Sequence, residues 1–384
     1  MLGKIAAVLL GIAALALLLA ACEDEEGAPT GPSPTSTPAD TAAPVESIDG
    51  VPIVPLAIGD EVELPQDIAL IMEIGCVECH CPCVQGLVRV YRDPAGEVKS
   101  EPLFIPEDEL PPRLVASDKA ETGFEEVEPY IIGGFAVSDG GSQIAVAVCS
   151  RGYCGPYEPA EATADAQTTL FRSLDGGLTW EELAVLDGAH SVDGVVSDGV
   201  IVSTVFEKTT THQIVPRGEI PERPAQAAPG FPPFVLAGEM VWRTTDNRAL
   251  LSSDGGQVFG LTGEPGPQVG RIVPEPDGDR YATVSWVPET GGFHFGLAGQ
   301  DGRLLDTFTT EYCCPNIGGW LEPGRAIGNA YFIPEGTEFS PGLWRPALID
   351  LEAGVAHPIA VSNTFDQFTR PSIARSVLAV VSTS

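Results

Sequence analysis

Basic residues are scarce in this chain of 384 residues. It contains 20 lysine and arginine residues against 54 aspartate and glutamate residues, which gives a formal net charge of −34. Because binding to nucleic-acid phosphates requires concentrated basic side chains, this charge argues against a nucleic-acid partner. An acidic surface of this kind more often keeps a protein soluble than recognises a ligand.

Motifs for catalysis and metal binding are also missing. The five histidines are scattered, and the sequence contains no Gly-x-Ser-x-Gly motif and no glycine-rich phosphate loop. It has no Asp-x-Asp-x-Asp-Gly calcium loop either, and Asp277-Gly-Asp279 reads as a turn. The sequence therefore assigns no catalytic residue and no metal ligand, and it favours a protein that is not an enzyme.

Helical periodicity is absent beyond residue 60. Short runs of Val, Ile, Leu, Phe and Thr, such as Ile68–Ile74 and Tyr281–Val287, are separated by Gly, Pro or Asp, which predicts an all-β fold. Hairpin turns are expected near six glycines, at intervals of 80, 42, 37, 47 and 52 residues: Gly96, Gly176, Gly218, Gly255, Gly302 and Gly354.

A propeller blade of four strands repeats at roughly 40 to 50 residues, so these intervals predict a six-bladed β-propeller over residues 60–384, with seven blades as the alternative. The first interval holds either one blade with insertions at 107–128 and 150–166 or two compact blades. We expect the C-terminal run Val377–Ser382 to pair with strands from residues 64–105 and close the ring. A β-sandwich, the rival fold, would show no such period.

Two of the turns share a pattern. The segment from Ser173 to Trp180 has the spacing Ser-x-Asp-x-Gly-x-Thr-Trp. In such a hairpin an Asp accepts bonds from amides of its own loop, a Gly takes a positive φ, and a Trp packs under the turn. The residues concerned are Ser173, Asp175, Gly177, Thr179 and Trp180, and Ser252, Asp254, Gly256 and Phe259 repeat the spacing with Val258 in place of the Thr. The alternative for the second copy is an ordinary Asp-Gly-Gly turn.

These turns and the repeat length resemble the Asp-box (BNR) propellers, which include sialidases and many exported proteins of unassigned role. The resemblance implies a propeller of six or seven blades, but not sialidase activity, because function depends on particular sites. Sialidases are expected to carry a Phe/Tyr-Arg-Ile-Pro motif, two further arginines and a Tyr/Glu pair. The nearest match here, Arg271-Ile-Val-Pro274, is interrupted. A sialidase-like glycoside hydrolase is therefore an alternative function.

The first 22 residues resemble a bacterial lipoprotein signal. Lys4 precedes the apolar run Ile5–Leu19, and Leu19-Ala-Ala-Cys22 ends it. The resemblance implies that residues 1–21 are a signal peptide and that Cys22 carries the lipid; an ordinary secretory signal or an uncleaved anchor is the alternative. Residues 22–59 are acidic and then rich in Pro, Thr and Ser, which predicts a disordered linker. We therefore expect a lipid-anchored protein on the extracytoplasmic side of the membrane, in the cell envelope.

Eight cysteines remain after Cys22, and an even number in an exported chain predicts disulfides. They form three groups, Cys76, Cys79, Cys81 and Cys83, then Cys149 and Cys154, then Cys313 and Cys314. The short separation within the second group suits a local bridge. We expect the third group to pair with two members of the first, whose other two cysteines would pair with each other. All three groups lie in predicted connections between strands, and the first two follow equivalent strands, so they can meet on one face of the ring.

The run Cys76-Val-Glu-Cys79-His80 also resembles a c-type haem attachment site, in which His80 would bind the iron. A haem-bearing electron carrier is thus a second alternative, although Cys81 and Cys83 leave little room for a pocket wall. A zinc site at Cys79, His80, Cys81 and Cys83 is a third, but adjacent ligands fit a tetrahedron poorly.

The preferred function is a binding or scaffold module that recognises an unknown protein or glycan through a disulfide-braced loop face, because rigid loops lose little entropy on binding. Tyr153 and Tyr157, in the connection that Cys149 and Cys154 bracket, are the candidate contact residues.

Overall fold

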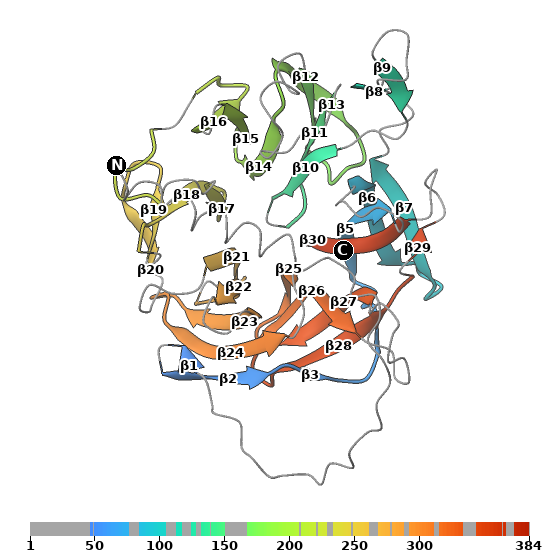
Figure 1. Cartoon of the computed structure of the whole chain (residues 1–384). Helices are drawn as coiled ribbons and strands as arrows, with labels where there is room; N and C mark the ends of the chain where they lie inside the picture. The colour runs from blue at the N-terminus through green and yellow to red at the C-terminus, as the bar shows by residue number, and fades with distance from the viewer. Residues whose placement is uncertain are drawn as a thin grey trace, which may run out of the picture. The chain divides into compact units, whose positions relative to one another are not determined.

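Six β-sheets stand in a ring around a central axis (Figure 1). The computed structural model of the chain describes residues 47–48, 50–76, 84–104, 113–116, 124–127, 132–138, 140–149, 167–206, 209–219, 222–228, 233–246, 249–260, 268–276, 279–287, 292–310, 315–332, 343–362, 364–365 and 372–383. Internal contacts divide the chain into Met1–Pro44 and Val45–Ser384, and the ring belongs to the second unit. The described residues contain no helix, and therefore no helix that is long and apolar enough to cross a membrane. The fold is the expected all-β propeller.

The blades are numbered here in chain order from residue 132. Blade 1 comprises β10 (Ile132–Val137), β11 (Ile144–Cys149), β12 (Gln167–Ser173) and β13 (Glu181–Asp187), and blade 2 comprises β14 (Ser191–Val196), β15 (Gly199–Phe206) and β16 (Thr209–Val215). Blade 3 comprises β17 (Phe234–Leu236), β18 (Glu239–Arg243), β19 (Ala249–Ser252) and β20 (Gln257–Gly260), and blade 4 comprises β21 (Gln268–Pro274), β22 (Arg280–Val287), β23 (Gly292–Gly299) and β24 (Leu304–Thr310).

Blade 5 comprises β25 (Asn316–Glu322), β26 (Arg325–Phe332), β27 (Leu343–Asp350) and β28 (Val355–Ala360). Blade 6 joins the two ends of the ring, because β30 (Ser372–Ser382) pairs with β5 (Ile68–Cys76), which is followed by β6 (Val84–Arg92) and β7 (Val98–Phe104). The short strand β29 (Thr364–Phe365) pairs with the other edge of β30. In blade 2 the described residues after β16 contribute one bridge, between Ile214 and Glu219.

The innermost strands establish that there are six blades. Strands β10, β14, β17, β21, β25 and β30 contact one another in this order, and β30 contacts β10. The interval between Gly96 and Gly176 therefore contains one blade, and the division into two compact blades was wrong. The hairpin of β8 (Arg113–Ala116) and β9 (Phe124–Val127) lies within the predicted insertion at 107–128. The insertion at 150–166 lies outside the described residues.

The C-terminal strand closes the ring as the sequence predicts. Val377 pairs with Met72 and Val381 pairs with Ala69 across the antiparallel ladder of β30 and β5. Strand β25 lies directly against β30, since a Cβ atom on Gly318 would stand 2.5 Å from Val377 Cγ1 and 2.8 Å from its carbonyl oxygen. This close approach needs a residue without a side chain, so Gly318 is a packing requirement of the closure.

The N-terminal strands cover the outer edges of two blades, which the sequence did not predict. Strands β1 (Ser47–Ile48) and β2 (Val51–Pro55) lie beside blade 4, where β2 runs parallel to β24, while β3 (Ala57–Ile58) and β4 (Val62–Glu63) run parallel to β28 of blade 5. Residues 47–58 thus belong to the propeller rather than to the linker expected over 22–59. Prolines are compatible with β2 because each of its residues pairs on one side only, residues 51–52 with β1 and residues 53–55 with β24.

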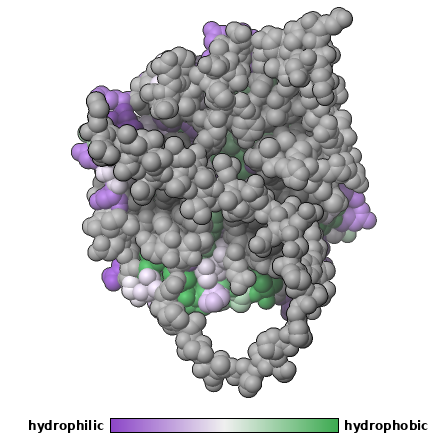
Figure 2. All heavy atoms as spheres, viewed as in Figure 1, coloured by the Kyte–Doolittle hydropathy of each residue, from purple (hydrophilic) through white to green (hydrophobic). Residues whose placement is uncertain are grey.

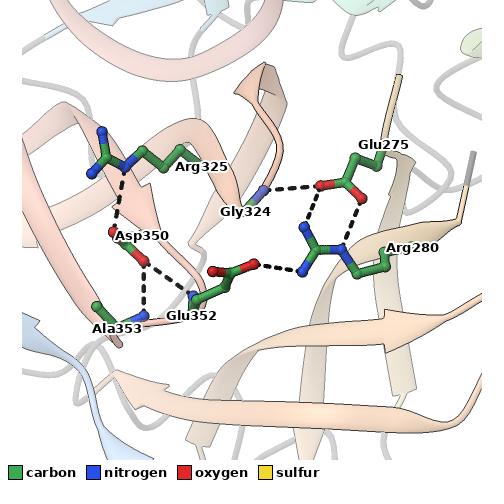
Figure 3. A network of polar contacts seen from close by, with 7 residues as sticks. All are labelled: Glu275, Arg280, Gly324, Arg325, Asp350, Glu352 and Ala353. Atoms are coloured by element: carbon green, nitrogen blue, oxygen red, sulfur yellow. Dashed lines mark hydrogen bonds and ion pairs between the residues drawn. The ribbon is translucent and has the colours of Figure 1, made fainter. Parts of the chain in front are cut away.

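Neighbouring blades 4 and 5 are joined by buried polar contacts at their turns (Figure 3). The Glu275 carboxylate, whose side chain is 3% exposed, accepts two bonds of 2.8 Å from Arg280 and one of 2.9 Å from the Gly324 amide. Arg280 also donates to Glu352 at 2.6 Å. On the same boundary, Trp320 Nε1 donates to the Val273 carbonyl at 3.0 Å. These bonds connect β21 and β22 of blade 4 to the turns of blade 5.

The two faces of the ring differ in their connections. On one face, here called the turn face, first strands connect to second strands and third strands to fourth. The six glycines predicted to form hairpins all lie there, with φ between +67° and +87°. The opposite face, here called the loop face, carries the connections from second to third strands and from blade to blade. Those from second to third strands span residues 77–83, 150–166, 207–208, 244–248, 288–291 and 333–342.

Candidate functional site

Polar groups of the turn from Ser173 to Trp180 form hydrogen bonds with one another. Asp175 Oδ1 accepts bonds from Ser173 Oγ at 2.8 Å and from the Thr179 amide at 2.9 Å, while Oδ2 accepts from Thr179 Oγ1 at 2.6 Å. Gly177, with φ of +92°, donates its amide to Ser173 Oγ at 2.8 Å. Trp180 Nε1 donates to Leu103 O at 2.7 Å. The turn therefore connects blade 1 to blade 6 and has a structural role.

The bonds to Asp175 make this turn sensitive to acid. The Thr179 hydroxyl and amide and the Ser173 hydroxyl lower the pKa of Asp175 from 3.8 to about 2. The folded state therefore favours the ionised carboxylate, and its stabilising effect is complete above the unfolded pKa and is lost as the pH falls through about 2.

We expect Asp175→Asn to lower the urea midpoint of unfolding near neutral pH, because the uncharged amide accepts weaker bonds. The difference in urea midpoint between this variant and the unmodified protein should shrink progressively as the pH is lowered below about 4. Asp254→Asn, the same change in the second turn, should have a smaller effect. A pH-independent difference for Asp175→Asn would contradict the assigned role of the charge.

The second turn repeats part of this geometry. Ser252 Oγ donates to Asp254, and Asp254 Oδ1 accepts the Gly256 amide at 3.0 Å, so the Ser252 hydroxyl and this amide lower the pKa of Asp254. Val258 supplies no hydroxyl where Thr179 stands in the first copy. Phe259 is buried and packs against Tyr281 of blade 4, with ring centres 4.3 Å apart. This turn also joins neighbouring blades.

Two cysteines end equivalent strands on the loop face. Cys76 ends β5 and Cys149 ends β11, which are the second strands of neighbouring blades 6 and 1, as the sequence predicted. Cys149 is buried, and its Sγ lies 3.3 Å from Thr168 Oγ1. The pairing of the cysteines stays a prediction.

The other predicted site residues lie outside the described residues. They are Cys22, Cys79, His80, Cys81, Cys83, Tyr153, Cys154, Tyr157, Cys313 and Cys314. Except for Cys22, their positions in the chain relative to the strands are known. Residues 77–83 and 150–166 follow second strands, and residues 311–314 lie between blades 4 and 5. Within the described part of the chain, no three His, Cys, Asp or Glu side chains gather closely enough to hold a metal ion.

A cavity of about 220 Å³ lies on the axis of the ring. Its wall comes mainly from the innermost strands of blades 1, 2, 3, 4 and 6, and its charged residues are Asp193 of β14 and Arg271 of β21. Figure 2 shows hydrophobic residues along the lower edge and in small areas near the middle of the view, whereas hydrophilic residues lie mainly at the periphery. Sequence reasoning missed this site because its residues come from strands that are far apart in the chain.

Asp193 of the cavity wall lies at a β-bulge. The register of β14 and β15 shifts between Val192 and Gly194, so Asp193 is the extra residue of the bulge. Its side chain is 11% exposed, and its two oxygens lie 3.1 Å from Ser203 Oγ and 3.2 Å from His212 Nδ1. The His212 ring packs edge-on against Trp242 of blade 3, with ring centres 5.3 Å apart. The carboxylate is thus held in a fixed position.

Arg271 crosses from blade 4 to blades 5 and 6. Its guanidinium donates to the Leu378 carbonyl of β30 at 2.9 Å and to Asn316 Oδ1 of β25 at 3.4 Å. Asn316 Nδ2 donates to the Val377 carbonyl at 2.9 Å. Arg271 is the residue that most nearly matched the arginine of the sialidase motif. Among the described residues, however, the cavity wall holds one arginine and one carboxylate, not three arginines and an acidic pair, which disfavours the sialidase alternative.

Together, the ring, its closure and its connections define the protein as a six-bladed β-propeller. No protein-family model matches the sequence, and no curated protein matches it. Solved structures that it resembles include hydrazine synthase of Kuenenia stuttgartiensis, with 8% identity and a TM-score of 0.37 over 58% of this chain and 63% of the other. The chain therefore spans less than two thirds of that chain.

Two further solved structures are similar in fold. YCF48 bound to D1 peptide shares 12% identity, with a TM-score of 0.36 over 85% of this chain and 97% of the other. The β-propeller domain of the trilobed protease from Pyrococcus furiosus shares 8% identity, with a TM-score of 0.22 over 56% of this chain and 54% of the other. At such identities and scores, these similarities say nothing about the function of this chain.

Proposed function

We propose that this propeller is a binding or scaffold module, anchored by a lipid on Cys22 to the extracytoplasmic side of a membrane, with the loop face as its recognition surface. The difference between the two faces carries the proposal. Glycine turns connect the strands of the turn face, whereas every cysteine of the mature propeller lies in or beside a connection of the loop face.

Disulfides support this function because they restrict connections before a partner binds. Ordering a flexible connection costs conformational entropy at the moment of binding, and a bridge removes part of that cost. We pair Cys149 with Cys154, and Cys313 and Cys314 with members of the group at residues 76–83. We also assign the turns at Ser173 and Ser252 to the Asp-box class, in which they shape the blades and leave recognition to the connections.

Photo-crosslinking in intact cells tests the recognition surface. We expect a photoreactive amino acid at Tyr157 to give discrete crosslinked products with a protein or glycan of the envelope. The matched control places it at Leu178, which is 64% exposed and lies in a hairpin of the turn face. Products from Leu178 with none from Tyr157 would contradict the proposal.

A variant with residues 150–166 replaced by Gly-Asn, and Cys149 by Ser, separates recognition from folding. The paired residues Cys149 and Thr168 bring the ends of β11 and β12 together, so a three-residue loop of Gly, Asn and Gln167 can connect them. This variant should keep a cooperative thermal transition and lose the crosslinked products formed by a photoreactive residue elsewhere on the loop face. Products of unchanged yield would exclude the 150–166 connection as a contact.

A further inference from the structure

The outer edge of blades 4 and 5, here called the apolar rim, carries exposed apolar side chains. It consists of β24 and of residues 51–58, here called the strap, which include β2 and β3. Three of the seven large hydrophobic side chains that are exposed among the described residues lie there, namely Val54 and Ile58 of the strap and Leu305 of β24. Figure 2 shows hydrophobic residues along the lower edge of the view, where β2 and β3 lie in Figure 1.

Backbone hydrogen bonds fix the strap against both blades. The Leu56 amide donates to the Thr309 carbonyl of β24 at 3.0 Å, and the Ala57 amide donates to the Gly354 carbonyl of blade 5 at 2.9 Å. The Leu56 side chain packs against the core that blades 4 and 5 share. The exposed side chains therefore belong to a segment that is already ordered, so contact with a surface costs little further chain entropy.

The strap lacks the negative charge that dominates the chain. Residues 50–58 read Gly-Val-Pro-Ile-Val-Pro-Leu-Ala-Ile and contain no Asp, Glu, Lys or Arg, although the formal net charge of the chain is −34. Transfer of a charged side chain from water to apolar surroundings is strongly unfavourable, whereas transfer of apolar side chains is favourable. The composition of the strap thus fits contact with a lipid surface.

The chain reaches this rim from the proposed lipid anchor. Residues 23–46 separate Cys22 from Ser47, the first residue of β1, which pairs with the strap. Their composition predicts a flexible linker, and a flexible chain of this length has a root-mean-square span of roughly 25 to 30 Å. A lipid on Cys22 would therefore hold the rim close to the membrane, where the high effective concentration populates even a weak contact.

We propose that the apolar rim docks onto the lipid surface of the membrane that holds the anchor; this inference rests on the proposed lipid at Cys22. Val54, Ile58 and Leu305 enter the boundary between the headgroups and the acyl chains, because burial of apolar area drives binding at this depth. The strap lies at the outer edge of the ring, so docking there lays the ring axis along the membrane. The loop face then stays accessible to a partner.

Photo-crosslinking tests the docking with the protein extracted from the envelope and placed in phosphatidylcholine vesicles. A photoreactive amino acid at Val54 or Ile58 should give phospholipid adducts at a yield at least about 10-fold above that from Val185. Val185 is the matched control, because it is 50% exposed, against 47% for Val54, and lies on an outer strand of blade 1. Equal adduct yields would overturn the proposal, as would crosslinks between two copies of the chain in place of lipid adducts.

The intact mass of the same samples reports separately whether Cys22 carries a lipid. A lipid on Cys22 together with equal adduct yields would overturn the docking and leave the anchor in place. An unmodified Cys22 together with adducts confined to positions 54 and 58 would overturn the anchor and support the docking.

Substitution then assigns the contact to the apolar side chains. With the photoreactive residue at position 54, Ile58→Glu should lower the adduct yield about 10-fold, because its carboxylate resists transfer from water. Val185→Glu should leave the yield unchanged. Thermal unfolding verifies that both variants are folded, and an unchanged yield from folded Ile58→Glu would contradict insertion of the strap.

Discussion

A chain truncated after Ser362 is expected to lose the folded ring. The truncation removes β29 and β30, so blade 6 loses its innermost strand and β25 loses the surface on which Gly318 and Gly319 pack. Buried Val377 and Ala379 disappear, and Leu70 and Met72 become accessible to water. Burial of one large aliphatic side chain contributes about 1.5 to 3 kcal/mol, and a whole domain is stable by only about 5 to 15 kcal/mol. The loss of a central strand therefore exceeds the stability available.

Near-ultraviolet circular dichroism and urea unfolding measure this effect. The truncated chain should show no cooperative transition, and a synthetic peptide of residues 363–384 should restore one in a concentration-dependent manner. The control removes Met1–Pro44, which lies outside the unit that holds the ring, and should leave the midpoint unchanged. A cooperative transition at the original midpoint without β30 would show that this strand does not close the ring.

Glu275→Ala is expected to destabilise the protein by about 2 to 3 kcal/mol, because it removes three hydrogen bonds to a buried carboxylate and leaves the Gly324 amide without this acceptor. Glu275 is buried, receives both bonds of a bidentate Arg280 contact and caps the Gly324 amide (Figure 3). Glu352→Ala is the matched control, since Glu352 contacts the same Arg280 but its side chain is 61% exposed. The control should cost less than about 1 kcal/mol.

Urea unfolding over a range of pH checks the assignment. The Arg280 bonds lower the pKa of Glu275 below its ordinary value of 4.5. A carboxyl group whose pKa is lower in the folded state stabilises the protein above the unfolded pKa, and this stabilisation is lost as the pH falls through the folded pKa. The cost of Glu275→Ala should therefore diminish below about pH 4.5. Equal costs for the two variants would contradict a buried bond between blades 4 and 5.

The features that the sequence predicted are those set by local chemistry. Gly96, Gly176 and Gly354 each lie between two runs of apolar residues that form strands. A tight turn between such strands requires the positive φ that glycine adopts readily. The spacing of such turns favoured six blades, although the interval of 80 residues left seven blades as the alternative. Ring closure was predictable because an uncovered strand edge is unfavourable, and pairing of the apolar C-terminal run with the strands of residues 64–105 removes one.

The features that the sequence did not predict depend on distant partners. Val51-Pro-Ile-Val-Pro55 has the composition of a linker, and it becomes a strand because β24 offers an open edge. Asp193 and Arg271 meet at one cavity only because the ring brings their blades around a common axis. Trp242 and Trp320 are buried in cores that neighbouring blades share.

Mass spectrometry of the envelope form of the protein, intact and after non-reducing digestion, tests the functional account most directly. We predict a mature chain that begins at a lipid-bearing Cys22, a Cys149–Cys154 bridge, and bridges from Cys313 and Cys314 to the group at residues 76–83. Eight free thiols, or haem attached to Cys76 and Cys79, would contradict a disulfide-braced loop face held at the membrane.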